Sequence, residues 1–213
     1  MEAHQMGARE ADVAPAPEPA ARSGAWTPAN PAPLGLAGFA LTTFVLSIFN
    51  AHLVGSAGSG VVLGVALAYG GVAQLLAGMW EFKKGNTFGA TAFASYGAFW
   101  ISFWAFVVFY SAKVPKADAT QAVGLYLFAW GIFTLYMWIA SFKTTAAVNL
   151  VFFLLTITFF LLAFGEWGTS SGLSKLGGYF GIATAIVAWY ASFAGVINST
   201  FGKVVLPTKP LRV

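Results

Sequence analysis

Six apolar stretches without a single Asp, Glu, Lys or Arg constrain this chain more than any other feature. They lie at about residues 34–54, 58–80, 87–110, 121–142, 146–165 and 177–198. Each has roughly the 20 residues that a helix needs to cross the hydrocarbon core of a bilayer. Only helices and closed barrels satisfy their backbone in lipid, and the period-two alternation of barrel strands is missing. The sequence therefore predicts an all-α integral membrane protein with six transmembrane helices per protomer.

The composition supports a lipid environment and excludes several other classes. Of 213 residues, 58% are hydrophobic and 8% are charged, against about 25% charged in soluble domains. The absence of cysteine excludes disulfides, thiolate metal sites and cysteine nucleophiles. The net charge of +4 is spread over loops and tails, which gives no basic stripe for nucleic acid. We expect membrane lipid around the protein and no nucleic-acid partner.

The chain divides into a tail, a membrane domain and a second tail. Residues 1–29 are rich in Ala, Pro and Glu and predict a disordered segment. Residues 30–202 hold the six helices, and residues 203–213 form a C-terminal tail. Eight Lys and Arg residues fall on the side of the termini and three on the other side. The positive-inside rule therefore predicts that both termini are cytoplasmic, in a multi-pass protein of the cell membrane.

Catalysis is not indicated. The loops are short, and no His, Asp or Glu cluster lies at membrane depth for metal or acid–base chemistry. We expect a protein that is not an enzyme and that has no metal or cofactor. The missing intramembrane charges also argue against a carboxylate proton relay. They favour a small solute that passes as a neutral acid, or as a monoanion met by hydroxyl and amide donors.

A few polar side chains interrupt the apolar helices. Thr42, Thr43 and Asn50 share a stripe of the first helix with Phe39, and Gln74 of the second helix lies among small residues. The threonines suit ordinary helix–helix hydrogen bonds as well as a polar pathway. An intramembrane glutamine is costly, so for Gln74 we favour a narrow passage lined by its amide.

Two further groups stand near these positions. Tyr96 lies in the middle of the third helix, where its hydroxyl needs a partner. Glu81 lies two turns beyond Gln74, next to Lys83 and Lys84. A solvated charge cluster is one interpretation of Glu81, and a cytoplasmic gate is the other.

The chain contains "NPAPLGL" followed by "GFALTTF", the block "YGGVAQLLAGMWEFKKGNTFGATAFASYGAFW", and the late "FGKVVLP". Together these motifs resemble the acetate uptake transporter family, to which the succinate–acetate permeases belong. The resemblance covers residues 30–208. It implies a six-helix protomer, a homo-hexamer, and a separate pathway in each protomer for acetate and related short carboxylates, including succinate. In the family, passage is proton-coupled or channel-like.

The resemblance also assigns roles to residues. It implies a constriction of Phe39, Tyr96 and Leu155, and a polar lining that includes Thr42, Thr43, Asn50 and Gln74. Leu155 sits in an apolar run, which gives reasoning from the residues no reason to select it. Some bacterial members carry a bulky Phe where this chain has Ala122, so packing or permeant preference differs there.

The start of the first helix adds a last candidate. Asn30 is placed as an N-cap, with Pro31 at the first helical position, although Pro33 disfavours helical angles at Ala32 and moves the predicted start to Leu34. The positive end of this helix would face the cytoplasm, where a carboxylate would gather. We therefore expect Asn30 at the rim of the inner mouth. The rival class, a membrane-embedded sensor or scaffold without transport, has little use for a polar stripe at mid-membrane depth.

Overall fold

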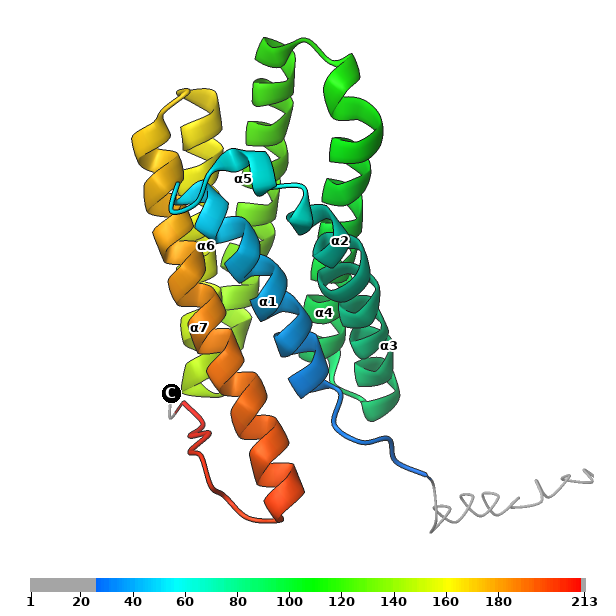
Figure 1. Ribbon diagram of the computed structural model, residues 1–213. Helices are drawn as coiled ribbons and strands as arrows, with labels where there is room; N and C mark the ends of the chain where they lie inside the picture. Colours follow the sequence, from blue (N-terminus) through cyan, green and yellow to red (C-terminus); the bar gives the residue numbers. More distant parts are fainter. Residues whose placement is uncertain (1–25, 212–213) are drawn as a thin grey trace, which may run out of the picture.

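The computed structural model describes residues 26–211 and shows an all-helical bundle (Figure 1). Within these residues, six helical spans are long and apolar enough to cross a membrane. They are Ala32–Asn50, Ser56–Lys84, Thr87–Lys113, Lys116–Ser141, Ala146–Trp167 and Ser171–Phe201. The predicted six-helix membrane fold is confirmed. The predicted tail of residues 1–29 lies largely outside the described residues.

Two of the spans are interrupted by π-helical turns. The elements are α1 (Ala32–Asn50), η1 (Ser56–Gly58), α2 (Val61–Leu67), η2 (Ala68–Ala73), α3 (Gln74–Lys84), α4 (Thr87–Ala105), η3 (Phe106–Tyr110), η4 (Ser111–Lys113), α5 (Lys116–Ser141), α6 (Ala146–Trp167) and α7 (Ser171–Phe201). The turns η2 and η3 are π-helical, and η1 and η4 are 3₁₀ turns. A π turn adds a residue per turn, so it changes the face that the next residues present.

Polar caps fix several of the helix ends. Asn86, Thr145 and Ser170 each accept a hydrogen bond from the backbone N–H three residues further on, at the starts of α4, α6 and α7. Gly85 ends α3 and Gly202 ends α7, with φ of 76° and 63° in the left-handed region that glycine adopts without strain. These local signals account for the short connections between neighbouring spans.

The helices extend further into their polar ends than the apolar pattern predicts. α7 begins six residues before position 177, and α5 begins five residues before position 121, so Lys175 and Lys116 are helical. Long charged side chains at a helix end can reach the interface, so charge there does not end a helix. α1 begins at Ala32 rather than at Leu34, with Pro33 in the first turn, where its missing N–H is not needed.

Close packing of α1 sets the centre of the bundle. α1 lies against α7 and against the π turn η2, and α6 lies between α5 and α7. A Cβ atom on Gly38 would stand 2.6 Å from the carbonyl oxygen of Tyr69, and one on Gly70 would stand 2.6 Å from Oγ1 of Thr42. Glycine at both positions therefore allows α1 and η2 to approach backbone to backbone.

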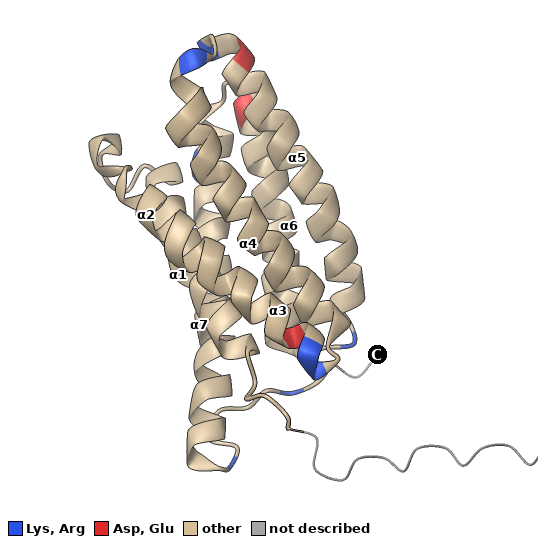
Figure 2. Ribbon diagram, turned by 90° about the vertical axis from the view of Figure 1, so that its right-hand side faces the viewer, with Lys and Arg blue, Asp and Glu red and all other residues tan. Residues whose placement is uncertain are grey.

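The charged residues gather at the two ends of the bundle, and its middle carries none (Figure 2). We call the end where α1 begins and α7 ends the near end, and the opposite end the far end (Figure 1). This distribution suits a bilayer, because the apolar middle would face lipid and the charges would face water.

The segment 203–211 folds back at the near end. The side chain of Asn198 binds backbone atoms of Val205 and Leu206, and the hydroxyl of Tyr190 donates to the carbonyl of Pro207 at 2.7 Å. Further on, the segment pairs with the turn between α5 and α6 through two backbone hydrogen bonds of 3.0 Å, at Ala146 and at Leu211. It therefore joins the end of α7 to the start of α6.

Candidate functional site

Three cavities follow one another between the helices. The near cavity, of about 370 Å³, extends from Lys143 and Pro210 at the near end to Gln74. The central cavity holds only about 40 Å³ and includes Thr43. The far cavity, of about 340 Å³, reaches Glu166 at the far end. Neighbouring cavities share wall residues, so the series runs through the protomer from one end to the other.

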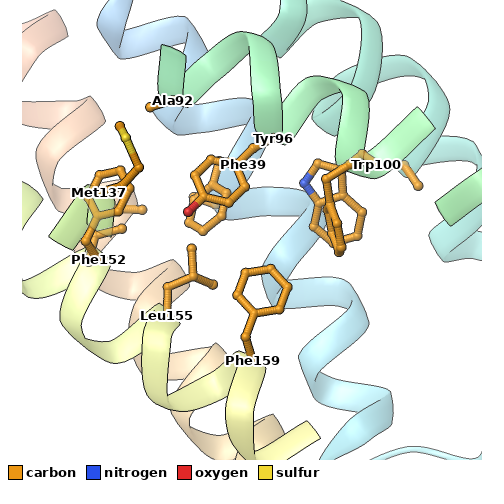
Figure 3. Close-up of a cluster of buried hydrophobic side chains, with 13 residues drawn as sticks. Phe39, Ala92, Tyr96, Trp100, Met137, Phe152, Leu155 and Phe159 are labelled. Carbon is orange, nitrogen blue, oxygen red and sulfur yellow. The ribbon is translucent and has the colours of Figure 1, made fainter. Parts of the chain in front are cut away.

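Three residues separate the near cavity from the central cavity. Phe39, Tyr96 and Leu155 line both, and they are the residues that the two walls have in common. Their side chains are 3% to 5% exposed. The ring centroids of Phe39 and Tyr96 are 5.8 Å apart, and Leu155 points toward them from α6 (Figure 3). The three residues of the predicted constriction are thus brought together from α1, α4 and α6.

Tyr96 presents its ring to the cavities, while its hydroxyl is held by α5. The hydroxyls of Tyr96 and Thr134 lie 2.9 Å apart, and Thr134 donates to the carbonyl of Trp130 at 2.7 Å. Since a hydroxyl has one proton, Tyr96 is the donor in this pair. This bond supplies the partner that a mid-membrane tyrosine needs, and it leaves the aromatic ring as the part of Tyr96 that faces the constriction.

Gln74 carries an amide that the protein leaves unsatisfied. The residue is 1% exposed and lines the near cavity, next to the constriction. Neither its Nε2 nor its Oε1 has a hydrogen-bond partner among residues 26–211. It is the first residue after η2, so the π turn sets its direction. A buried amide without partners is costly, and its two donors and one acceptor are available to a small polar solute.

The polar residues of α1 fall in different surroundings. Thr43 lines the central cavity, and its buried Oγ1 has no partner within the described chain. Asn50 lines both the central and the far cavity. Thr42 instead donates to the carbonyl of Val65 at 3.4 Å and packs against Gly70. The two adjacent threonines therefore have different surroundings. Thr43 lies on a cavity wall, as a polar pathway requires, and Thr42 lies in a helix–helix contact.

Asn30, the candidate at the start of α1, lies at the near end but does not line the near cavity. The Oδ1 of Asn30 accepts from the Nζ of Lys84 at 2.7 Å and from the N–H of Ala32 at 3.3 Å. Asn30 lines a separate hollow of about 430 Å³ between the start of α1 and α7. It thus tethers the start of α1 to the end of α3.

Glu81 is fully buried, so it is not a solvated surface charge. Its Oε2 accepts from Nδ2 of Asn86 at 2.8 Å, and its Oε1 has no partner in residues 26–211. Asn86 lines the near cavity and caps α4. The carboxyl group of Glu81 therefore stands one layer behind the cavity wall and is joined to it through Asn86.

Sequence reasoning missed several wall residues and one residue that supports the wall. Phe152 and Val148 line the near cavity, Glu166 lines the far cavity, and Thr134 holds Tyr96. Phe152, Val148 and Thr134 look like ordinary helix residues, and no pattern in one sequence distinguishes them. Glu166 carried a signal, because it is an acidic residue at the end of a strongly apolar helix. No group of three or more His, Cys, Asp and Glu that would suit a metal occurs in the described part.

Six membrane spans around a line of internal cavities define a multi-span protein of the channel and transporter class. A sequence model described as the GPR1/FUN34/yaaH family matches residues 14–213. The chain belongs to this family.

Relatives of known name support this assignment. The "Succinate-acetate/proton symporter SatP" of Escherichia coli K12 is 43% identical over 179 residues, which cover 84% of this chain and 94% of that protein. "Accumulation of dyads protein 2" of Saccharomyces cerevisiae is 45% identical over 188 residues, which cover 86% of this chain and 66% of the yeast protein. This chain therefore spans about two thirds of the length of the yeast relative.

A solved structure has the same fold. The "Structure of the bacterial acetate channel SatP" superposes with a TM-score of 0.79 at 40% sequence identity. The match covers 85% of this chain and 99% of that chain. The two chains therefore share their overall arrangement of helices.

Proposed function

We propose that this protein carries acetate and related short carboxylates, including succinate, across the cell membrane through the three cavities of each protomer. The observation that carries the proposal is the unpartnered amide of Gln74 on the wall of the near cavity, beside the constriction. A small carboxylate could accept from this amide and so replace part of its water shell. The names of the bacterial symporter and of the acetate channel supply the substrate class.

The pathway has a polar group on each side of an apolar ring. Gln74 lies in the near cavity and Thr43 in the central cavity, and between them stand Phe39, Tyr96 and Leu155. The ring removes water from the solute, and the polar groups on both sides limit the cost of that step. The ring itself offers no charge to an anion. The crossing species is therefore neutral acetic acid, or an anion that moves from one donor to the next.

We also propose that the near end and both termini face the cytoplasm, and the excess of Lys and Arg on that side supports this orientation. We also propose a homo-hexamer, as the family resemblance implies. Large apolar side chains such as Leu125, Ile139 and Phe193 are exposed on the outside of the protomer, where lipid or neighbouring protomers would cover them. Native mass spectrometry from mild detergent should then give six copies, and monomers alone would contradict this.

Uptake of labelled acetate by proteoliposomes tests the function. We expect wild-type protein to take up acetate and Gln74→Leu to slow the uptake at least about tenfold, because an apolar wall replaces the donor. Gln121→Leu is the matched control, since Gln121 is an exposed glutamine on α5, and it should leave uptake unchanged. Uptake measured at clamped voltage and varied pH separates proton coupling from a channel. A wild-type protein without acetate flux would favour the sensor or scaffold.

A further inference from the structure

A single acidic residue stands where the pathway opens at the far end. Glu166 lies in the last turn of α6 and lines the far cavity. It also lines an adjoining hollow of about 400 Å³, which we call the mouth cavity and which includes Asn50 and His52. Asn50 belongs to the far, central and mouth cavities alike. A solute that travels between the far end and the central cavity therefore passes beside Glu166.

The charge of Glu166 has no ion-pair partner among residues 26–211. It is also the one Asp, Glu, Lys or Arg on the walls of the far and mouth cavities. His52 and Tyr126 are the other titratable groups on these walls.

The remaining charged residues of the far end lie on the surface. Lys116 and Asp118 in the first turn of α5 and Lys175 in the first turns of α7 are exposed, and Lys113 lies over the ring of Tyr110 at 5.8 Å. Glu166 is therefore the charge that a solute in the far and mouth cavities meets on their walls.

Local helix stability does not explain this residue. The C-terminal end of a helix carries a partial negative charge, so an acidic residue in the last turn is unfavourable there. A carboxylate at the opening of a route for anions would also slow them. A residue that is unfavourable for its helix and repels the general substrate class suggests selection among substrates rather than attraction of them.

We propose that Glu166 sets the charge selectivity of this pathway and favours neutral acids and monocarboxylates over dicarboxylate dianions. This proposal rests on the proposed function. Repulsion between charges grows with their product, so a succinate dianion is opposed twice as strongly as an acetate anion, and a neutral acid is not opposed. The walls of the far cavity are largely apolar side chains such as Phe99 and Leu127, so screening there is weaker than in bulk water. The chain would thus prefer acetate to succinate.

The ratio of succinate flux to acetate flux in proteoliposomes tests the proposal, at pH 7.5, where succinate is a dianion. Glu166→Gln should raise this ratio about 3- to 10-fold, with acetate flux equal to or above that of wild type, because the repulsion is removed from both substrates. Asp118→Asn is the matched control, because it removes an exposed acidic residue at the same end, and it should leave the ratio unchanged. Equal shifts in both variants, or a ratio within twofold of wild type in Glu166→Gln, would overturn the proposal.

A second measurement needs no variant. Raising the ionic strength screens the carboxylate, so the ratio in wild-type protein should rise with salt. A ratio independent of salt would contradict a role for Glu166 charge, even if Glu166→Gln does not fold. If wild-type protein carried neither acetate nor succinate, that result would contradict the proposed function itself, and with it any role of Glu166 in substrate selection.

Discussion

The near and far cavities are almost equal in size, about 370 and 340 Å³, but they hold their polar groups differently. In the near cavity the amide of Gln74 is buried and has no partner in the described chain. In the far cavity the hydroxyl of Tyr126 is already bonded to Ser102 and to the carbonyl of Phe99. The unsatisfied amide of Gln74 thus lies on the near side of the constriction, and the unsatisfied hydroxyl of Thr43 lies beyond it, in the central cavity.

The charges of the two cavities differ as well. Lys143 lines the near cavity, whereas Glu166 lines the far cavity. A cation in the same cavity as an unused amide suits the binding of a carboxylate, and an anion at an entrance suits its selection. The comparison indicates two tasks in one pathway, with binding on the near side of the ring and selection on the far side.

The largest effect should follow from separating α1 from η2, because this contact positions Gln74. We expect Gly38→Val to destabilise the protein by more than about 3 kcal/mol, since the added carbon atoms meet the backbone of Tyr69. The melting temperature in detergent should fall by about 6–12 °C. Gly64→Ala is the control, because a Cβ atom there meets nothing within 4 Å. Equal melting temperatures for the two variants would show that the close approach is not needed.

The ring itself should respond to the size of Tyr96 and not to its hydroxyl. Tyr96→Ala removes the aromatic wall shared by the near and central cavities, so labelled butyrate should enter at a rate closer to that of acetate. Tyr96→Phe loses only the bond to Thr134, worth about 1 kcal/mol, and acetate flux should stay within about twofold. A Phe variant as altered as the Ala variant would assign the function to the hydroxyl.

The adjacent threonines of α1 sharpen the contrast between cavity wall and helix contact. Thr43→Val should reduce acetate flux about 3- to 10-fold, because its free hydroxyl lines the central cavity. Thr42→Val keeps the shape that packs against Gly70 and loses one long hydrogen bond. Flux through Thr42→Val should therefore match wild type, with a loss of stability below about 1 kcal/mol. The reverse order of the two fluxes would contradict the placement of the pathway.

The smallest effect is expected at the border of the near cavity. The C-terminal segment reaches this cavity through Pro210 and is held to α7 by the hydroxyl of Tyr190. Tyr190→Phe removes that single bond, so stability should fall by about 1 kcal/mol and acetate flux should stay at the wild-type rate. Thermal unfolding and uptake by the same preparation check both statements. A large loss of flux would show that the segment controls access.

The fold was predictable because only helices and closed barrels can satisfy their backbone hydrogen bonds in lipid. Six uncharged stretches of sufficient length predicted six spans, and the polar residues Gln74 and Tyr96 were selected because burial of a polar group in lipid needs a reason. Helix ends were placed less well, since Ser170 starts α7 before the apolar pattern begins. The resemblance to a family supplied Leu155, which is one leucine among many.

Other parts of the site depend on three-dimensional packing. The choice between Thr42 and Thr43 follows from which side of α1 meets η2, and adjacent residues of one sequence do not reveal it. A solvated charge was one of two interpretations of Glu81, and it is wrong because the turn between α3 and α4 buries this residue behind Asn86. The role that we propose for Glu166 depends on its position on the walls of both the far and the mouth cavity, which one sequence does not reveal.

The central claim is that acetate crosses the ring between the two cavities, and thiol labelling combined with acetate flux tests it most directly. The chain has no cysteine, so Val148→Cys places a single thiol in the near cavity and Val123→Cys places one in the far cavity. In oriented vesicles, a membrane-impermeant thiol reagent should block acetate flux through Val148→Cys only from the near side, and through Val123→Cys only from the far side. Labelling of both thiols with acetate flux unchanged would contradict the account.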